Sequence, residues 1–243
     1  MRVRYEMKEA AKALMAGNAV ALVLMTLAPA VVVIATVFII PLCIGLFFSF
    51  VFYGSGVYAP IMSILSLLHV VLFIVGIIAG ILTHLGVFAT MVDFSRTGDE
   101  AVLTIKNMTR YLSDEGWQIF KVFFMQRFFL NLWAFIPIVG PFIAIVKGYS
   151  YSMSLYNFVT DANRANRFST EYITLSRKKM FGFKQDLFVM DLSFILWTLL
   201  GFITFGLAFF WVGPYQTLTR IEFYKDVDAL YKENLIAEGK TVI

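Results

Sequence analysis

Seven ionisable side chains stand within or at the ends of long apolar stretches, and these are the residues of this sequence that could do chemistry. They are Lys147, Asp191, Arg127, Asp93, His84, Arg220 and Glu222. A charge near the centre of a bilayer costs about 2.5–3.5 kcal/mol or more, so such groups normally face protein or a wet cavity and pair with one another. We therefore predict that they line a polar vestibule, formed by the last four membrane spans and open to the cytoplasm.

Two of these groups are the strongest candidates for an ion pair. Lys147 is about 11 residues, or roughly 16 Å by helical rise, from the inner end of its expected span, and Arg127 is similarly deep. We expect Lys147 to pair with Asp191, with Arg127 as a competing partner for the aspartate. A purely structural interpretation stays open, because lysine and arginine can extend toward the headgroups and one buried ion pair can serve only to fix the register of two helices.

The composition indicates a membrane protein rather than a soluble one. Of the 243 residues, 60% are hydrophobic, 17% are aromatic and only 15% are charged, and the mean hydropathy is +0.79. A soluble domain has about 45–50% apolar and about 25% charged residues. A chain this apolar could not cover its own surface in water, so we expect an all-α integral membrane protein with a polytopic helical bundle.

Six apolar runs are long enough for transmembrane helices, which need about 20 residues each. They cover residues 18–52, 58–95, 117–136, 141–158, 186–203 and 206–224. The first two, at about 35 residues or roughly 52 Å each, exceed a bilayer core of about 30 Å. They must project beyond the membrane, fold back or break, and Pro29 and Pro41 are the expected kink or break points. Glycine and proline near 54–57, 137–141 and 201–206 predict short connections, and so three helical hairpins.

The charged residues indicate which side of the membrane each connection faces. Between Asn18 and Asp93 the sequence has no Lys, Arg, Asp or Glu, whereas basic residues gather before each hairpin and at the C-terminal end. Because lysine and arginine mark the cytoplasmic side, we expect three outward-pointing hairpins and both termini in the cytoplasm. A cleaved signal peptide is the competing interpretation of the first run, but that run is longer than the apolar core of about 7–15 residues typical of such signals.

Each hairpin follows a short segment with an apolar stripe on one helical face and a glycine after it. The stripes are Met7, Ala11, Leu14 and Met15, then Ile105, Met108 and Leu112, then Ile173, Ser176, Met180 and Phe181, followed by Gly17, Gly116 and Gly182. Such segments are typical of interfacial amphipathic helices that end at a glycine cap. The chain then divides into an interfacial helix (1–17), a first hairpin (18–95), a second helix and hairpin (96–158), a third helix and hairpin (159–228) and a cytoplasmic tail (229–243). The first and third units align without gaps, which permits an internal repeat but does not require one.

Four short stretches in the second half of the chain carry a family resemblance. They cover residues 147–153, 175–180, 187–194 and 211–215, with Phe223 and Tyr224 beyond. In this order they resemble a bacterial family of uncharacterised integral membrane proteins, known only as a numbered domain of unknown function. The resemblance extends from about Lys8 to Asp228, with a longer stretch at 41–80 and an altered 182–185 segment as departures. It implies a bacterial cytoplasmic-membrane location and a helical fold, and it implies no activity.

The sequence offers little support for an enzyme. No P-loop, no His-Glu-x-x-His and no Gly-x-Ser-x-Gly motif occurs. The lone Cys43 excludes an internal disulfide, and His69 and His84 are too few for a histidine-based metal site without several carboxylates, so we expect no cofactor and no metal. The remaining enzymatic alternative is an intramembrane hydrolase in which Asp93 and Asp191 share a proton. Neither aspartate has the glycine-flanked context that such a protease would show.

Three classes of function remain. The charges within the spans favour a non-enzymatic membrane component that transports or senses a lipid, peptide or other amphiphile through the vestibule. The second class is a scaffold or immunity-type protein that acts through helix contacts with another membrane protein, and the third is a membrane enzyme. Membrane lipids are the expected partners in every case. The basic 164–184 segment fits a cytoplasmic loop attracted to anionic lipid better than it fits a nucleic-acid site.

Overall fold

The computed structural model describes residues 2–113, 115–164 and 167–239, and every regular element in these ranges is helical. The first half contains α1 (Arg4–Met15), α2 (Ala19–Ile34), η1 (Ala35–Ile39), α3 (Ile40–Phe52), α4 (Tyr58–Thr97), η2 (Glu100–Val102), α5 (Ile105–Met108) and α6 (Arg110–Ser113). The second half contains α7 (Gly116–Ala134), α8 (Gly140–Tyr151), α9 (Ser154–Thr160), α10 (Ser169–Lys179), α11 (Lys184–Leu192), α12 (Ile195–Ile203) and α13 (Phe209–Ala237). The all-α prediction is confirmed.

Three helical stretches are long and apolar enough to cross a membrane. They are Ala19–Phe52, Tyr58–Thr97 and Lys184–Ile203. The expected span at 141–158 is divided into α8 and α9, and α8 with its 12 residues is roughly 18 Å long, which is less than the bilayer core of about 30 Å. The expected span at 117–136 corresponds to α7, which carries Lys121 and Arg127, and the one at 206–224 corresponds to the first part of α13, in which charged residues begin at Arg220. The structure therefore supports three crossings, and the six-span arrangement stays a prediction.

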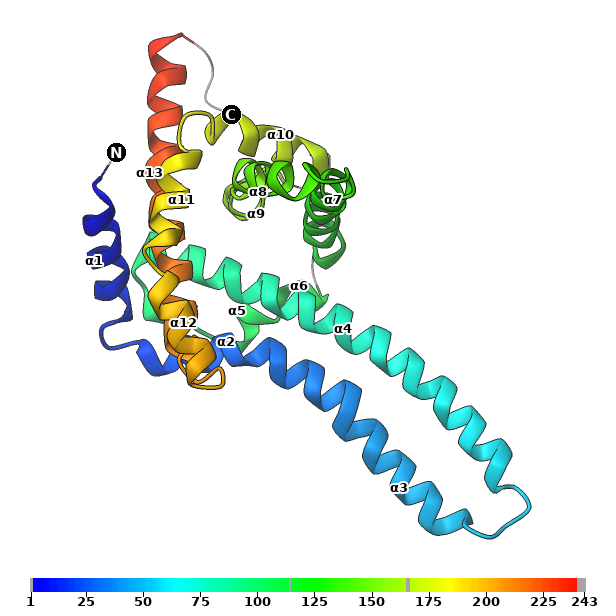
Figure 1. Cartoon of the computed structure of the whole chain (residues 1–243). Helices are drawn as coiled ribbons and strands as arrows, with labels where there is room; N and C mark the ends of the chain where they lie inside the picture. The colour runs from blue at the N-terminus through cyan, green and yellow to red at the C-terminus, as the bar shows by residue number, and fades with distance from the viewer. Residues whose placement is uncertain (1, 114, 165–166, 240–243) are drawn as a thin grey trace.

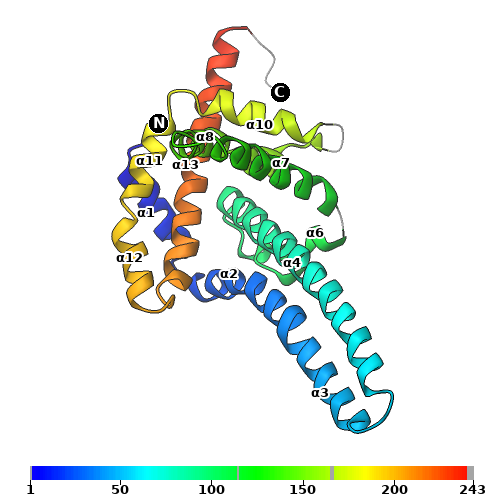
Figure 2. The ribbon, with the colours of Figure 1, turned by 45° about the vertical axis from the view of Figure 1, so that its right-hand side comes forward.

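The first two long helical stretches run side by side and project away from the rest of the molecule (Figures 1 and 2). They approach closely because α4 presents glycine to α2 and η1: a Cβ atom built on Gly76 would lie 2.2 Å from the Thr36 Oγ1, and one on Gly80 would lie 2.3 Å from a Val33 methyl group. Small residues four apart are the usual device for close helix packing in membranes. Residues 41–80 thus extend as two adjacent helices joined by a tight turn.

The helix of the first run does not break at either proline. Pro29 lies inside α2, and Pro41 follows the π-helical turn η1 at the start of α3. Proline lacks the amide hydrogen that an α-helix needs, and a π-helical turn is a local way to absorb such a defect. Of the two outcomes expected at these prolines, a kink or a break, a break is wrong: the run stays helical from Ala19 to Phe52.

The apolar stripe of α1 is covered by protein rather than by lipid headgroups. Met7 and Ala11 are fully buried and Met15 is nearly so, and α1 packs along α13 (Figure 1). Arg2 fastens this arrangement, because its guanidinium donates to Glu222 and to Asp226 on α13. The prediction that the 1–17 segment lies with its stripe in the membrane interface is therefore wrong, since an amphipathic pattern does not say whether lipid or another helix covers it.

The other two segments expected as interfacial helices differ from one another. The second is divided into the short helices η2, α5 and α6, and Met108 of its stripe is buried against α4. The third forms α10, whose Ile173 and Ser176, with the adjoining Met180, are buried, whereas Phe181 is exposed. Gly17 and Gly182 have positive φ angles of 88° and 90° and end their helices as expected. At the second unit Glu115 has the positive φ instead of Gly116.

The first and third units share their buried positions. Met15 and Met180, Leu22 and Leu187, and Met25 and Met190 are each no more than 5% exposed. In both units a helix ends at a positive-φ glycine and a second helix begins directly afterwards. The local structures of the two units are thus alike, and an internal repeat stays a prediction.

A buried ion pair joins α10 to the second half of α13. Lys179, which is 7% exposed, donates hydrogen bonds to Asp228 and to Asn157 of α9. Burial lowers the pKa of Lys179. Burial alone would raise the pKa of Asp228, but hydrogen bonds from Lys179 and Lys232 outweigh it and hold that pKa below its ordinary value of 3.8. Helix α13 continues to Ala237, well into the segment expected as a tail, and residues 240–243 of that tail lie outside the described residues.

Candidate functional site

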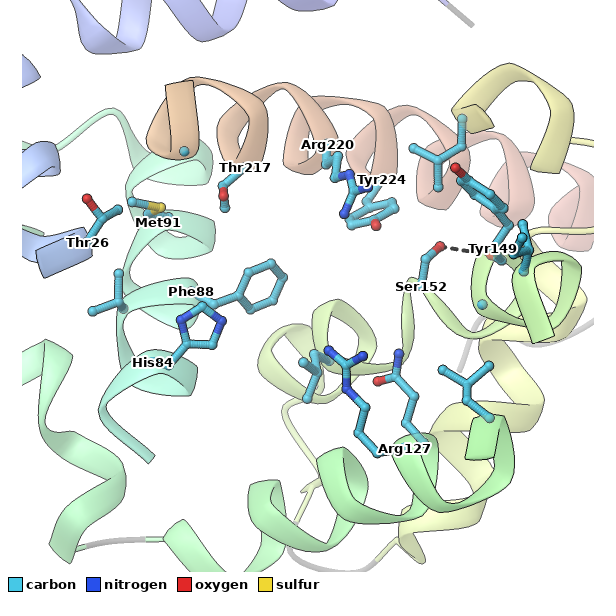
Figure 3. Close-up of a pocket in the computed structure, with 18 residues that line it drawn as sticks. Thr26, His84, Phe88, Met91, Arg127, Tyr149, Ser152, Thr217, Arg220 and Tyr224 are labelled. Atoms are coloured by element: carbon cyan, nitrogen blue, oxygen red, sulfur yellow. Dashed lines mark hydrogen bonds between the residues drawn. The ribbon is translucent and has the colours of Figure 1, made fainter. Parts of the chain in front are cut away.

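A cavity of about 650 Å³ lies where α2, α4, α7, α8, α9, α11 and α13 surround a common space. His84 of α4, Arg127 of α7 and Arg220 of α13 enter it, and the two arginines point in from opposite sides (Figure 3). Among the described residues no aspartate or glutamate lines the cavity. Three of the seven residues predicted to line a vestibule therefore meet in one place, with α2 and α4 of the first hairpin as additional walls.

Helical periodicity explains why these helices present a mixed surface to the cavity. Residues three and four apart lie on one face of an α-helix. On α13 this face carries Gly213, Thr217, Arg220 and Tyr224, and at α8 it carries Ile145, Gly148, Tyr149 and Ser152. Small and polar side chains thus recur on one side of each helix, with the apolar Ile145 among them on α8.

The remaining wall of the cavity is apolar. Val87 and Phe88 of α4, Leu130 of α7 and Leu155 of α9 all line it. The Gln126 side-chain oxygen, at another part of the wall, is buried and accepts no hydrogen bond from the described residues. The cavity therefore combines an apolar surface with cationic and hydrogen-bonding groups, which is the composition of a site for a molecule with one polar end.

Asp191 does not pair with Lys147. Its two carboxylate oxygens accept hydrogen bonds of 2.8 and 2.6 Å from the Nε and Nη2 of Arg220. This two-point arrangement matches the planar guanidinium better than it would match an ammonium. The predicted Lys147–Asp191 pair is therefore wrong, and so is the competing assignment of the aspartate to Arg127, because α11 and α13 lie in contact and bring Arg220 to Asp191 first.

Lys147 and Arg127 both contact aromatic rings. The Lys147 ammonium lies 4.7 Å from the centre of the Trp133 ring, and the Arg127 guanidinium lies 5.3 Å from the centre of the Phe123 ring. Lys147 is on the opposite face of α8 from the cavity-lining residues and does not line the cavity. Within the described ranges neither cation forms an ion pair with a carboxylate, so Arg127 brings an uncompensated charge to the cavity.

Asp93 and Glu222 lie outside the cavity lining and belong to separate ion pairs. Asp93 accepts a 2.7 Å hydrogen bond from Arg110. Glu222 is 2% exposed and accepts from Ser95, Arg2 and Lys225 at 2.6 to 2.9 Å. The two aspartates considered as a proton-sharing dyad, Asp93 and Asp191, thus have different arginine partners.

Several cavity residues were not expected from the sequence. Tyr149, Ser152, Thr217 and Tyr224 were not among the residues predicted to line a vestibule, yet all four line the cavity (Figure 3). The sequence feature that could have identified them is the recurrence of small and polar residues at helical spacing inside apolar runs. In the parts of the chain that the structure describes, no group of three or more His, Cys, Asp or Glu side chains could hold a metal ion.

Comparison with known proteins adds a family but no activity. No curated protein and no solved structure matches the chain. The family match covers α8 to α12 and most of α13, and so includes Asp191 and Arg220 but not His84 or Arg127. It is shorter than the expected resemblance, which began near Lys8. Residues 138–231 match the family described as "Protein of unknown function (DUF975)", which confirms the resemblance to a numbered family without a known function.

Proposed function

We propose that this protein is a non-enzymatic, multi-pass protein of the cytoplasmic membrane that binds an amphiphile with an acidic headgroup and transports or senses it. The single observation that carries the proposal is Arg127, a cation without a carboxylate partner among the described residues, placed in an amphipathic cavity. The Arg127 side chain is exposed, and a charge at membrane depth is costly unless it is paired. An anionic ligand would supply the missing partner.

The size and the lining of the cavity fit such a ligand. Its volume of about 650 Å³ is within the range of about 300–1,000 Å³ that small-molecule sites occupy. Arg127 and His84 would contact the acidic group, and Arg220, already neutralised by Asp191, would donate hydrogen bonds while its position stays fixed. The apolar residues of α4 and α7 would cover the hydrocarbon part of the ligand.

The membrane placement is part of the same proposal. Three helices are long and apolar enough to cross a membrane, and both termini lie in the cytoplasm only if a further segment crosses as well, for which the uncharged first half of α13 is the candidate. The basic segments before and after the first hairpin support this orientation, with the hairpins pointing outward. The cavity would then open toward the cytoplasmic half of the bilayer. A ligand could reach it from the inner leaflet, where acidic lipids and fatty acids reside.

Calorimetric titration of the protein in a neutral detergent tests the binding. Oleate and oleyl alcohol share one chain length and differ in charge, so their affinities isolate the contribution of the headgroup. The wild type should bind oleate at least about tenfold more tightly than the alcohol, which corresponds to about 1.4 kcal/mol. Arg127→Gln should abolish this preference, and Lys106→Gln, which removes an exposed charge outside the cavity, should retain it. Equal affinities in the wild type would refute the proposal.

The long hairpin favours the scaffold as a second candidate. Helix α3 has no buried residue, and the two helical stretches of 34 and 40 residues, roughly 51 and 60 Å long, extend well beyond a bilayer core of about 30 Å. The apolar surface of a helix that lies outside the bilayer core must be covered by protein to be kept from water. Gentle solubilisation tests this function. A second membrane protein recovered in equal amount with the chain, and lost when α3 and α4 are shortened by equal numbers of turns, would favour it over ligand binding.

A further inference from the structure

A second polar site lies on the side of α8 that faces away from the cavity. It is a groove of about 510 Å³ between α8, α10 and the start of α11. Its basic residues are Lys147 of α8, Arg177 and Lys178 of α10, and Lys184 of α11, and Ser150 and Thr174 add hydroxyl groups. We call these six residues the basic groove. Among the described residues no acidic side chain lines it.

The four cations of the basic groove are not neutralised by the protein. None of them forms an ion pair in the described parts of the chain, whereas the neighbouring Lys179 is paired with Asp228. The nearest carboxylates along α11 have other partners, since Asp186 lies 3.7 Å from Arg4 and Asp191 binds Arg220. Four like charges around one groove repel one another. An anion from outside the chain would relieve this repulsion.

The groove is held in a fixed shape by buried hydrogen bonds beneath it. The Ser176 hydroxyl, which is fully buried, donates to the Ser150 carbonyl oxygen at 2.8 Å and accepts from the Met153 amide at 3.1 Å. These bonds fix α10 against the end of α8, so Lys147 and Arg177 stand on two walls whose separation is set. Lys184 adds a charge at the first residue of α11, where the helix dipole is positive as well.

The surroundings of the groove are those of a membrane interface. Phe181 lines it and is 81% exposed, and the Lys147 ammonium rests on the Trp133 ring. The apolar stretch Lys184–Ile203 begins at its edge. Exposed aromatic side chains beside a basic cluster at the end of an apolar helix are typical of the level of lipid headgroups.

We propose that the basic groove binds a phosphate group, and that this phosphate belongs to the headgroup of an acidic membrane lipid. Lys147 and Arg177 contact the phosphate oxygens from opposite walls, and Lys178 and Lys184 add charge around them. The acyl chains lie along the apolar surface of α11 and α12. This site is independent of the cavity, because α8 separates them.

Lipid binding measured by native mass spectrometry in a neutral detergent tests this assignment. The probes are phosphatidylglycerol, phosphatidylcholine and inorganic phosphate. The wild type should bind phosphatidylglycerol about tenfold more tightly than phosphatidylcholine, and the double variant Lys147→Gln/Arg177→Gln should lose this preference. The matched control Arg96→Gln/Lys106→Gln removes the same two residue types from exposed positions elsewhere and should retain it.

Three results would overturn the assignment. Equal loss of the preference for phosphatidylglycerol in the control variant would mean that overall charge, and not the groove, attracts the lipid. Displacement of the lipid by inorganic phosphate at equal concentration would assign the groove to free phosphate instead. Absence of any preference in the wild type would remove the site. Arg177→Gln alone, a change at an exposed residue, provides the readout should the double variant fail to fold, and Arg127→Gln should keep the lipid, which separates this test from that of the cavity.

Discussion

Arg127 in the cavity and Lys179 beside α13 are both cations that face other helices, but they differ in burial and in how they are neutralised: Lys179 is 7% exposed, whereas Arg127 is exposed. Lys179 donates hydrogen bonds to Asp228 and Asn157 and so is paired with the chain's own groups, although the side-chain nitrogen of Asn157 has no partner among the described residues. Arg127 contacts only the Phe123 ring among the interactions of the described residues, and it faces open space. A charge that the chain itself neutralises stabilises the fold, whereas one left for an external anion serves binding.

The comparison predicts that Lys179→Met has the largest effect on stability. Removing one partner of a buried pair typically costs about 3–5 kcal/mol, and we expect the lower end of this range because Asp228 keeps its ion pair with Lys232. Thermal unfolding in a neutral detergent measures the loss. The adjacent exposed Lys178→Met should change stability by no more than about 0.5 kcal/mol, and similar losses in the two variants would contradict the distinction.

Glu222→Gln should have the next largest effect. The Glu222 carboxylate accepts hydrogen bonds from Ser95, Arg2 and Lys225, and hydrogen bonds to charged groups contribute about 1.5–3 kcal/mol. The same unfolding measurement should show a loss in this range, with α1 detaching first because Arg2 loses one of its partners. Glu233→Gln, at an exposed position of the same helix, is the matched control and should behave as the wild type.

Acid should weaken the Lys179–Asp228 pair in a defined direction. The pKa of Asp228 is held below 3.8 in the folded protein, so its contribution to stability is fully present above pH 3.8 and is lost as the pH falls below that value. Unfolding curves of the wild type and of Asp228→Asn should therefore differ at neutral pH and converge in acid. A constant difference down to pH 2 would contradict the assignment.

Arg127→Gln should have the smallest effect on stability and a large effect on binding. Because the Arg127 charge has no partner in the described chain, its loss should leave the unfolding temperature unchanged or slightly raised. The preference for oleate over oleyl alcohol should disappear in the same sample. A destabilisation as large as that of Lys179→Met would place Arg127 among the structural charges instead.

The sequence predicts the composition of the cavity better than its pairings. His84, Arg127 and Arg220 could be found because charges or an imidazole inside apolar runs are costly and must face a polar space. The partner of Asp191 could not be predicted, since Lys147 and Arg220 both stand at suitable depth and only the rotation and contact of α8, α11 and α13 decide between them. Helical spacing alone does not determine those rotations.

The same limit explains why the sequence did not predict that α13 covers α1, or that the first long run stays helical through Pro29 and Pro41. The stripe of Met7, Ala11 and Met15 predicts an amphipathic helix correctly, but the pattern fits burial against lipid and burial against α13 equally well. The all-helical fold and three of the six expected spans could be predicted from composition and length, because a membrane requires long apolar helices. The π-helical turn before Pro41 and the close contacts at Gly76 and Gly80 depend on neighbouring helices.

Native mass spectrometry of the protein released from its own membrane tests the central claim most directly. The wild type, Arg127→Gln and the groove variant Lys147→Gln/Arg177→Gln are compared in one neutral detergent. If the cavity binds an acidic amphiphile, a defined ligand mass should accompany the wild type and the groove variant and should be absent from Arg127→Gln. A cavity ligand retained by Arg127→Gln, or a wild-type protein that carries no acidic amphiphile, would contradict the account.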